Sequence, residues 1–338
     1  MSRDGGTESS VNAIRSALGF LGERLLADHS LAPLCTYRSG GSAELFVVVD
    51  DENELATIAK AISDIPGGSL IEQGLLHTIG KGSNLLVSDR GVKGLVIQLG
   101  ESFAEITINS ESGDRVAVGV GASASLPVVA RRTAAMGLTG FEWAVGIPGS
   151  VGGAVRMNAG GHGSELREVL TRVHLVDLES GEAMSMVPAQ LQLGYRRSSI
   201  QAHQIVTAIE IELERGDSAE AERRLSEIVK WRRENQPGGA NAGSVFTNPP
   251  GDSAGRLIDT AGCKGLRVGT AQISDKHANF IQVDPDGKAD DVMELMKEVV
   301  QRVKVAHGVT LHAETVLLGF PSEDVAAVKA PLGEVSDD

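Results

Sequence analysis

A short glycine-rich segment has residue types suited to holding a phosphate group. It reads Gly80-Lys81-Gly82-Ser83-Asn84-Leu85-Leu86 and follows a stretch predicted as a strand. Glycines allow several backbone N–H groups to turn toward one point, which forms a nest for anionic oxygens. Ser83 and Asn84 add side-chain donors, and Lys81 adds a positive charge. The alternative is an ordinary surface turn between strands, which has the same composition.

A second glycine-containing stretch, Val118 to Ala124, lies after a predicted strand and before a predicted helix. It is similar to a degraded dinucleotide-binding fingerprint, with Gly119 and Gly121 in place and Ala124 where the third glycine would stand. No acidic residue ends a second strand about 20 positions later, as an NAD site needs. We therefore expect close approach of backbone to a cofactor here, rather than a complete Rossmann unit.

The densest glycine cluster covers two neighbouring segments. The first reads Gly146-Ile147-Pro148-Gly149-Ser150-Val151-Gly152-Gly153-Ala154, and the second reads Met157-Asn158-Ala159-Gly160-Gly161-His162-Gly163. Each glycine costs backbone entropy on folding, so a core alone does not explain so many. A cofactor that lies against bare backbone explains them better than the alternative, a tightly packed turn region.

These segments must be positioned by a mixture of strands and helices. Interleaved strands and helices favour the α+β class with α/β units. We predict strands at 45–49, 77–79, 94–99, 103–108, 115–120, 169–176, 205–213, 280–283 and 315–318. We predict helices that begin at Asp51 and at Ser123 or Ser125, and further helices at 219–233, 253–261 and 290–307.

Composition excludes several classes of partner. The chain has 338 residues and a net charge of −14, whereas a nucleic-acid backbone needs a basic surface. It contains no apolar run long enough for a membrane span, and its N-terminus lacks the apolar core of a signal peptide. Cys35 and Cys263 predict neither a disulfide framework nor a zinc site, and the 8 histidines lack metal-ligand spacing. We expect a cytoplasmic monomer without metal, membrane or nucleic-acid partners.

The glycine stretches and later motifs together resemble the UDP-N-acetylenolpyruvoylglucosamine reductase (UDP-N-acetylmuramate dehydrogenase) family. The resemblance extends from about Leu31 to Gly319, and such an ordered series of motifs is specific. Tyr195 to Val206 contains no inserted loop, which resembles the compact subtype without a tyrosine-bearing substrate lid. The further motifs are Asp89, Gly91 and Gly94; Gly194-Tyr195-Arg196; Ala242-Gly243-Ser244-Val245-Phe246; Asn248-Pro249; Gly255, Leu257 and Ile258; Lys264-Gly265; His277-Ala278-Asn279-Phe280; and Glu314.

The resemblance implies a two-subdomain FAD-binding module of the vanillyl-alcohol-oxidase (PCMH) type, followed by an α+β substrate-binding domain. We place the subdomains at 16–99 and 100–215 and the C-terminal domain at 216–320, with poorly ordered polar tails at 1–15 and 321–338. The implied reaction uses NADPH and FAD to reduce the nucleotide-sugar UDP-N-acetylglucosamine enolpyruvate to UDP-N-acetylmuramate. That reaction is a cytoplasmic step of peptidoglycan precursor synthesis.

The resemblance also implies roles for single residues. Arg196 and Glu314 would stabilise an enolate-like intermediate, and Ser244 would give the proton. Taken singly, each has a simpler interpretation: a solvated strand end, a surface charge and a turn residue. Tyr195, Asn248 and Lys264 are candidate substrate contacts. Candidate cofactor contacts are Gly80, Lys81, Gly82, Ser83, Asn84, Leu85, Gly119, Gly121, Ile147, Pro148, Gly149, Ser150, Gly152, Gly153, Asn158, Ala159, Gly160 and Gly163.

The chain departs from the family pattern at three positions. His162 stands where the family often has Tyr, Thr247 where it often has Lys, and Val316 where many members have Arg. These departures bear on diphosphate contact and on hydrogen bonding in the site. Arg232 and Arg233 are interpreted as a solvated helix face. Two alternatives stay open: another FAD-dependent alcohol or sugar oxidoreductase of the same superfamily, and a catalytically silent nucleotide-binding protein, which needs only the loops.

Overall fold

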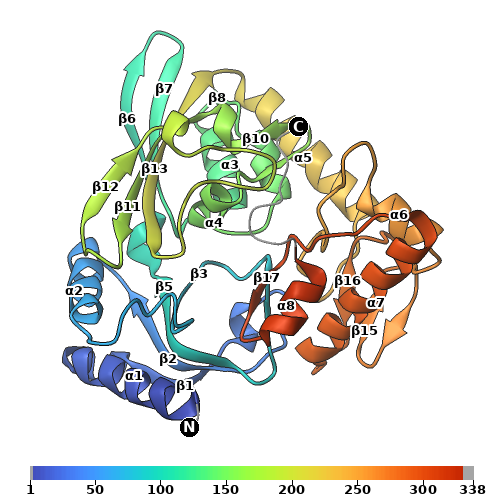
Figure 1. Cartoon of the computed structure of the whole chain (residues 1–338). Coiled ribbons are helices and arrows are strands. Elements are labelled where there is room, and N and C mark those ends of the chain that lie inside the picture. The colour runs from blue at the N-terminus through green and yellow to red at the C-terminus, as the bar shows by residue number, and fades with distance from the viewer. Residues whose placement is uncertain (1–2, 330–338) are drawn as a thin grey trace. The chain divides into compact units, whose positions relative to one another are not determined.

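A computed structural model describes residues 3–329, and its elements are labelled in Figure 1. The chain forms two compact units, which are described separately below. The first unit contains residues 3–29, 44–81 and 93–232, and the second contains residues 30–43, 82–92 and 233–329. Both units combine helices and strands, which confirms the predicted α+β class.

The first sheet of the first unit has the strand order β1-β2-β5-β3. Helix α2 begins where the Asp51 carboxylate accepts the Glu54 amide at 2.8 Å. Its apolar face packs with α1 into one core, in which Leu55, Ile58 and Ile14 are buried. The elements are α1 (Arg3–Ala17), β1 (Leu26–Ser30), β2 (Ser42–Val49), α2 (Glu52–Ser63), β3 (Leu76–Ile79) and β5 (Val92–Leu99).

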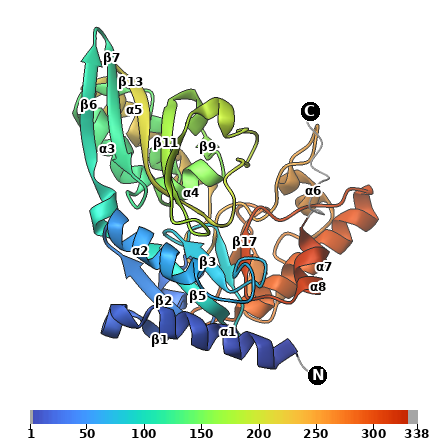
Figure 2. The same cartoon turned by 60° about the vertical axis from the view of Figure 1, so that its left-hand side comes forward.

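The second sheet of the first unit is antiparallel, with the order β12-β11-β13-β7-β6 and β8 paired to β13. Val116, Val118 and Val120 alternate toward a core that α3, α4 and α5 complete. Figure 2 shows α3 and α4 on the same face of this sheet. The elements are β6 (Ile106–Ser112), β7 (Arg115–Gly121), α3 (Leu126–Ala135), β8 (Leu138–Thr139), α4 (Val151–Arg156), β11 (Leu170–Asp177), β12 (Ala183–Met186), β13 (Gln204–Arg215) and α5 (Ser218–Asn235).

The second unit is built around one long helix, α7. Val292, Leu295 and Met296 lie on its buried face, and it ends at Gly308, whose φ of 71° suits glycine. Strands β14, β15 and β16 form an antiparallel sheet, and β4 pairs in parallel with β17. The elements are β4 (Leu85–Val87), α6 (Ala254–Thr260), β14 (Arg267–Val268), β15 (Ala271–Ile273), β16 (Ile281–Val283), α7 (Ala289–His307), β17 (Val316–Leu318) and α8 (Ser322–Val328).

Short elements complete the connections between the longer ones. The β9–β10 hairpin is the most relevant of these, because it continues the densest glycine stretch. The short elements are η1 (Gly19–Arg24), η2 (Ala32–Leu34), η3 (Glu101–Ala104), η4 (Glu142–Gly146), β9 (Gly160–Gly161), β10 (Ser164–Glu165), η5 (Leu166–Glu168) and η6 (Pro188–Gln190).

The predicted tails were wrong where the structure describes them. Residues 3–15 belong to α1, because Val11 and Ile14 are buried on one face of this helix, and Leu18, directly after it, is buried in the same core. Residues 322–328 form α8, and Val328 is 1% exposed in the core of the second unit. The rest of the predicted tails, residues 1–2 and 330–338, lies outside the described residues.

Other predicted boundaries also differ from the structure. Residues 82–92 belong to the second unit rather than to an N-terminal subdomain, because β4 pairs with β17. The first unit ends at Arg232 within α5 rather than at residue 215. The predicted strand at 103–108 begins only at Ile106, since Phe103 lies in the η3 turn, where its carbonyl accepts the Ser123 amide at 2.9 Å.

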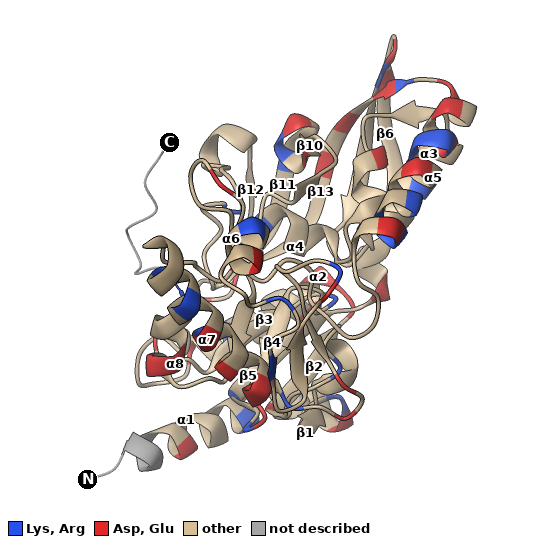
Figure 3. Cartoon of the chain, turned by 90° about the vertical axis from the view of Figure 1, so that its right-hand side faces the viewer, with Lys and Arg blue, Asp and Glu red and all other residues tan. Residues whose placement is uncertain are grey.

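The surface carries charges of both signs. Figure 3 shows acidic and basic residues interleaved along α5, where Glu220 forms ion pairs with Arg223 and Arg224. Within residues 3–329 no helix is long and apolar enough to cross a membrane. Cys35 and Cys263 are both free thiols and both buried.

Candidate functional site

Three glycine-rich segments converge within the first unit. Gly80 follows β3, and a Cβ atom at this position would lie 2.4 Å from Ser150 Oγ. The segment after β7 runs beside the same loop, because the Val151 amide donates to Ala124 O at 2.9 Å. Bare backbone from three distant parts of the sequence therefore gathers around Ser150, as a cofactor-binding loop cluster requires.

Ser150 organises this loop cluster. Its hydroxyl accepts the Gly153 amide at 3.3 Å at the beginning of α4. Gly149 has φ 134°, a conformation that L side chains rarely adopt, so only glycine fits there without strain. Pro148 and Gly153 are exposed. A ligand can thus reach the backbone of the segment directly.

Gly119 and Gly121 have a packing role that the sequence did not show. A Cβ at Gly121 would lie 2.1 Å from Phe103 O, and one at Gly119 would lie 2.7 Å from Thr107 Oγ1. Both glycines line a cavity of about 420 Å³ together with His174. Close strand packing accounts for these two glycines, and their contact with a cofactor stays a prediction.

The remaining part of the first motif, from Gly82 onward, belongs to the second unit, whereas Lys81 belongs to the first. Gly82 has φ 61°, and a Cβ there would lie 1.9 Å from Leu34 O. Asn84 Nδ2 donates to Glu314 O at 3.3 Å. The motif therefore links a predicted cofactor loop directly to the backbone of a predicted catalytic residue.

Sequence reasoning missed a segment that packs against this motif. Thr36 donates its amide to Gly82 O at 3.1 Å. Gly40 and Gly41 lie so close to the next turn that added Cβ atoms would lie 2.5 Å from Val87 O and 2.5 Å from Gly91 N. The adjacent Gly40-Gly41 pair in the sequence was the available signal for such a close approach.

Buried polar atoms without protein partners lie beside Glu314. Asn84 Oδ1 and Thr315 Oγ1 are buried and have no hydrogen-bond partner among the described residues. A buried acceptor or hydroxyl that lacks a partner is costly unless a ligand or water satisfies it. These two atoms are therefore candidate contacts for a polar ligand in the second unit.

The structure brings two of the three catalytic candidates together. The Glu314 amide donates to Val245 O at 2.8 Å, so Ser244 and Glu314 lie on neighbouring extended segments. A bridge between Phe246 and Ala313 continues this pairing. Both Ser244 and Glu314 are partly buried. The backbone segments that carry these two residues thus lie side by side although 70 positions separate them in the sequence.

The third catalytic candidate, Arg196, belongs to the first unit. It lies in the turn between Gly194 and Arg197 and has φ 56°. Its Nη2 donates to Gly160 O at 2.9 Å, and its guanidinium carbon lies 5.2 Å from the centre of the Tyr195 ring. The guanidinium is therefore held by the β9–β10 hairpin and by its own neighbour.

Asn158, a predicted cofactor contact, uses its side chain within the protein. It is 0% exposed, and Nδ2 donates to Glu165 Oε2 at 2.9 Å and to Gly194 O at 3.1 Å. Oδ1 accepts the Arg167 amide at 3.1 Å. The donors and the acceptor of this side chain thus serve the structure of the protein itself, and contact between Asn158 and a cofactor stays a prediction. Leu85 is likewise buried, as part of β4.

The candidate substrate contacts differ in how available they are. Tyr195 is 56% exposed. Asn248 Oδ1 accepts the Ala254 amide at 3.0 Å at the start of α6. Lys264 Nζ lies 3.7 Å from Asp259 Oδ2. All three residues are exposed, and Asn248 already has a structural role.

Two departures from the family pattern have partners within their own unit. His162 lies edge-on to Trp231, with ring centres 5.1 Å apart, and partial burial together with Arg232 lowers the pKa of His162. Thr247 Oγ1 donates to His312 O at 3.2 Å. Each substituted side chain is thus accommodated locally. Val316, the third departure, is 38% exposed at the start of β17.

Lys329 is a further residue near Glu314 that sequence reasoning missed. It follows α8, and its Nζ donates to Glu314 O at 3.5 Å. Burial lowers the pKa of the ammonium group to about 8, and the nearby Glu314 opposes that shift. The sequence did not reveal it because residues 321–338 read as a polar tail.

We expect Lys329→Met to stabilise the second unit at neutral pH. Below pH 8 the buried Lys329 side chain is charged in the folded protein, which lowers the free energy of unfolding. In the unfolded chain the same group loses its proton only near the ordinary lysine pKa of about 10.4. Wild-type stability should therefore rise as the pH increases between these two values. The substitution should add on the order of 1–3 kcal/mol at pH 7, and the gain should shrink toward pH 10.

Urea denaturation of both proteins at pH 7 and pH 10 measures this effect. Lys304→Met, which changes an exposed lysine on α7, is the matched control and should be neutral. A gain of equal size at both pH values would contradict the assignment to Lys329 ionisation.

Among residues 3–329, no group of three or more His, Cys, Asp or Glu side chains could hold a metal ion. The described geometry offers two neighbouring backbone segments with a serine and a glutamate in the second unit, and a guanidinium held at the β9–β10 hairpin in the first.

Two family models match the chain. The model for the C-terminal domain of UDP-N-acetylenolpyruvoylglucosamine reductase matches residues 235–318, and the FAD binding domain matches residues 43–186. These matches confirm an FAD-binding module followed by a C-terminal domain. The latter begins at the end of α5, close to where the second unit resumes.

Curated relatives and a solved structure extend the similarity over most of the chain. The UDP-N-acetylenolpyruvoylglucosamine reductase of Anaeromyxobacter sp. is 39% identical over 90% of this chain and 92% of its own length. That of Nitrobacter winogradskyi is 40% identical over 92% of this chain and 98% of its own length. The crystal structure of UDP-N-acetylenolpyruvylglucosamine reductase from Thermus caldophilus matches with a TM-score of 0.72 and 36% identity, covering 86% of this chain and 97% of that one.

Proposed function

Because the chain belongs to the UDP-N-acetylenolpyruvoylglucosamine reductase family, we propose that it reduces the enolpyruvyl group of UDP-N-acetylglucosamine enolpyruvate. The product is UDP-N-acetylmuramate, a peptidoglycan precursor, and NADPH is the proposed source of reducing equivalents. The observation that carries this proposal is identity of 39% over 90% of the chain with a named reductase. The pairing of the Glu314 amide with Val245 O, next to Ser244, supports it by placing the two residues on neighbouring segments.

The residues present fit FAD. Its phosphates need close approach of the backbone without intervening side chains, and Gly80 and Gly149 allow this in the first unit. By resemblance to the family, Ser83 and Asn84 are further candidate contacts, and Asn84 Oδ1 is buried without a hydrogen-bond partner among the described residues. When bound, FAD supplies the hydride that the substrate receives.

The reaction defines what the protein side chains must do. Hydride addition at C3 of the enolpyruvyl group leaves negative charge on C2 and on the adjacent carboxylate. Arg196 would bind this charge as a fixed cation, and Glu314 would donate a hydrogen bond from its protonated carboxyl. Preorganised donors at the position of developing charge lower the barrier of such a step.

Ser244 would then give its proton to C2. A free serine hydroxyl is a weak acid, so this role needs a site that stabilises the transient alkoxide. The neighbouring Glu314 segment and the partial burial of Ser244 support such a site. The roles of Arg196, Ser244 and Glu314 are carried from the family to matching positions in this chain.

The decisive experiment mixes the purified protein, NADPH and UDP-N-acetylglucosamine enolpyruvate. We expect a yellow protein that consumes NADPH only when the substrate is present. A yellow protein that instead consumes oxygen with an alcohol or sugar would favour another oxidoreductase of the superfamily. A colourless protein that takes up no FAD would leave only a silent nucleotide-binding role.

We also propose that the protein acts as a cytoplasmic monomer. The net charge of −14 and the absence of a membrane-spanning helix among residues 3–329 are compatible with this proposal. Sedimentation of the FAD-loaded protein should give the mass of one chain, 35.3 kDa. A mass of two or more chains at micromolar concentration would contradict the monomer.

We expect Gly80→Ala to weaken FAD binding by about tenfold while the protein stays folded. The new Cβ would lie 2.4 Å from Ser150 Oγ, so the hydroxyl must leave the Gly153 amide that it caps, which costs about 1 kcal/mol. The displaced loop should also lose contacts to FAD. A loss of about 1.4 kcal/mol of binding free energy corresponds to a tenfold weaker affinity.

FAD titration of the apoprotein measures this change. Gly238→Ala is the matched control, because a Cβ there meets nothing within 4 Å. Adding Ser150→Gly to Gly80→Ala should recover part of the affinity by making space for the methyl group. If Gly80→Ala binds FAD as wild type does, Gly80 is not part of the cofactor site.

A further inference from the structure

Two buried asparagines each hold the backbone beside one of the proposed catalytic residues. We propose that Asn158 and Asn279 are positioning residues, which act through Arg196 and Ser244 respectively by fixing the backbone that carries them. This inference rests on the function proposed above. Neither side chain has to touch the substrate or cofactor to act in this way.

Asn158 joins three backbone segments around Arg196. Its amide group donates to Gly194 O at 3.1 Å and to Glu165 Oε2 at 2.9 Å, and it accepts the Arg167 amide at 3.1 Å. Asn158 has φ 38°, a left-handed conformation that asparagine tolerates better than most residues. Both its backbone and its side chain are therefore suited to this position.

The turn that Asn158 holds is the turn that presents Arg196. Gly194 opens it, with reciprocal backbone hydrogen bonds to Arg197 of 3.1 and 3.2 Å. Arg196 then returns to the same region, since its Nη2 donates to Gly160 O at 2.9 Å, and Gly160 pairs with Glu165. The hairpin that Asn158 organises therefore holds Arg196 in two ways. Asn158 binds the backbone of the turn at Gly194, and Gly160 of the hairpin accepts the guanidinium of Arg196.

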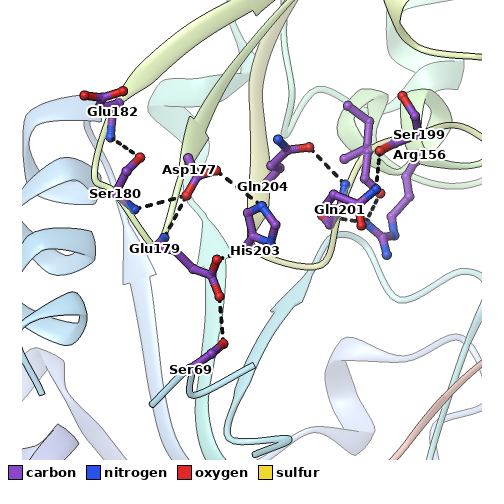
Figure 4. Close-up of polar contacts among 11 residues, drawn as sticks. Ser69, Arg156, Asp177, Glu179, Ser180, Glu182, Ser199, Gln201, His203 and Gln204 are labelled. Atoms are coloured by element: carbon purple, nitrogen blue, oxygen red, sulfur yellow. Dashed lines mark hydrogen bonds and ion pairs between the residues drawn. The ribbon is translucent and has the colours of Figure 1, made fainter. Parts of the chain in front are cut away.

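Further hydrogen bonds hold residues 200–201, at the C-terminal end of the segment that carries Arg196. The guanidinium of Arg156, at the end of α4, donates to Ile200 O and Gln201 O at 3.0 Å each. Figure 4 shows Arg156 directed at Gln201 from the neighbouring element. Ser198 Oγ donates to Arg156 O at 2.9 Å. The segment therefore has little freedom except at the turn, where Asn158 acts.

Asn279 performs the corresponding task in the second unit. It is 4% exposed, its Oδ1 accepts the Phe246 amide at 3.0 Å, and its Nδ2 donates to Phe246 O at 2.8 Å. Its own carbonyl accepts the Val245 amide at 2.9 Å. Ser244 is therefore followed directly by two residues whose backbone is held by Asn279.

Asparagine is suited to this role because its side chain reproduces a peptide group. One amide offers a donor and an acceptor in one plane, so it can pair with a backbone N–H and a C=O together. Aspartate has only acceptors when ionised, and leucine of similar shape has neither. Loss of the amide leaves buried backbone groups without partners, and the segment must move to find others.

The two asparagines should have different kinetic signatures. Arg196 binds the substrate carboxylate, so a displaced turn should weaken affinity. Ser244 only transfers a proton, so a displaced Ser244 should slow turnover with little change in affinity. Misplacement of a catalytic group by about 1 Å can cost about 100-fold. A merely structural role would instead lower stability, FAD content and both kinetic parameters together.

The experiment compares Asn158→Gly and Asn279→Leu in the FAD-loaded full chain. Glycine keeps the left-handed backbone at position 158, and leucine keeps the side-chain shape at position 279. The measurements are FAD content, thermal denaturation, affinity for UDP-N-acetylmuramate from the flavin absorbance change, KM and kcat. Asn109→Ala, at an exposed asparagine of β6, is the control and should match wild type.

We expect Asn158→Gly to weaken product affinity and raise KM by about 10- to 100-fold, with FAD content unchanged. The double variant with Arg196→Gln should bind product no more weakly than Arg196→Gln alone. Asn279→Leu should lower kcat by about 10- to 100-fold while product affinity stays within about twofold. If Asn158→Gly does not fold, Asn158→Asp, which also loses both donated hydrogen bonds, should give the same loss of product affinity.

Three results would overturn the inference. One is wild-type kinetics in either variant, and another is an additive loss of product affinity in the Asn158→Gly and Arg196→Gln double variant. The third is parallel loss of stability, FAD and both kinetic parameters. A wild-type protein that neither binds UDP-N-acetylmuramate nor consumes NADPH with the substrate would instead overturn the proposed function, and this inference with it.

Discussion

Ser244→Ala should leave reduction of the flavin by NADPH within about twofold of wild type and slow its reoxidation by substrate about 10³-fold. A positioned acid typically contributes 10²- to 10⁴-fold to a proton transfer, and alanine removes the only proton that the side chain can give. The substitution is small, and the neighbouring pairing of Val245 with Glu314 uses backbone atoms that alanine retains. The fold and the cofactor site should therefore persist.

Stopped-flow absorbance measures the two half-reactions separately. Ser110→Ala, at an exposed serine of β6, is the matched control and should behave as wild type in both. Ser244→Cys is an informative second variant, because a thiol is a stronger acid than a hydroxyl and should retain part of the rate. Equal losses in both half-reactions of Ser244→Ala would show that Ser244 is structural.

Glu314→Gln should also slow the second half-reaction, by about 10²-fold, because an amide N–H is a much weaker acid than a protonated carboxyl and stabilises the developing charge less well. Glutamine keeps the size of the side chain. The Glu314 backbone is held from both sides, because its amide donates to Val245 O and its carbonyl accepts from Asn84 Nδ2 at 3.3 Å. The variant should therefore keep its position and still donate a hydrogen bond, but a weaker one.

FAD content and product affinity provide the necessary checks for Glu314→Gln. We expect FAD content equal to wild type and product affinity within about threefold, a difference below 1 kcal/mol. Glu323→Gln, at an exposed carboxylate in the first turn of α8, is the matched control. Loss of flavin from Glu314→Gln, with no separate effect on reoxidation, would remove Glu314 from the catalytic assignment.

Most regular elements could be predicted from local patterns, and their exceptions have physical causes. The helix at 289–307 has apolar residues at helical spacing and a glycine stop, so its limits were visible in the sequence. The amphipathic pattern of Val11, Ile14 and Leu18 was overlooked within a polar segment. The strand β4 is only three residues long, and its parallel partner β17 lies more than 200 positions later, so no local signal could assign it.

In the candidate site, too, some features have a local signal in the sequence and others depend on the fold. The glycine requirement at Gly149 follows from a positive φ that the local composition suggested. The role of Asn158 could not be read from its motif, because its partners Glu165, Arg167 and Gly194 are defined only by the fold. Lys329 escaped notice for the same reason, since a lysine in a polar segment does not reveal its burial.

The sequence by itself determined the family, the order of the motifs and the identity of the residues that could do the chemistry, because these depend on residue type and spacing. Only the tertiary structure decided which of them meet. It pairs the Glu314 segment with Val245, places Arg196 on a turn held by Asn158, and divides the first glycine motif between two units. Such contacts depend on long-range strand pairing and burial, which local sequence does not encode.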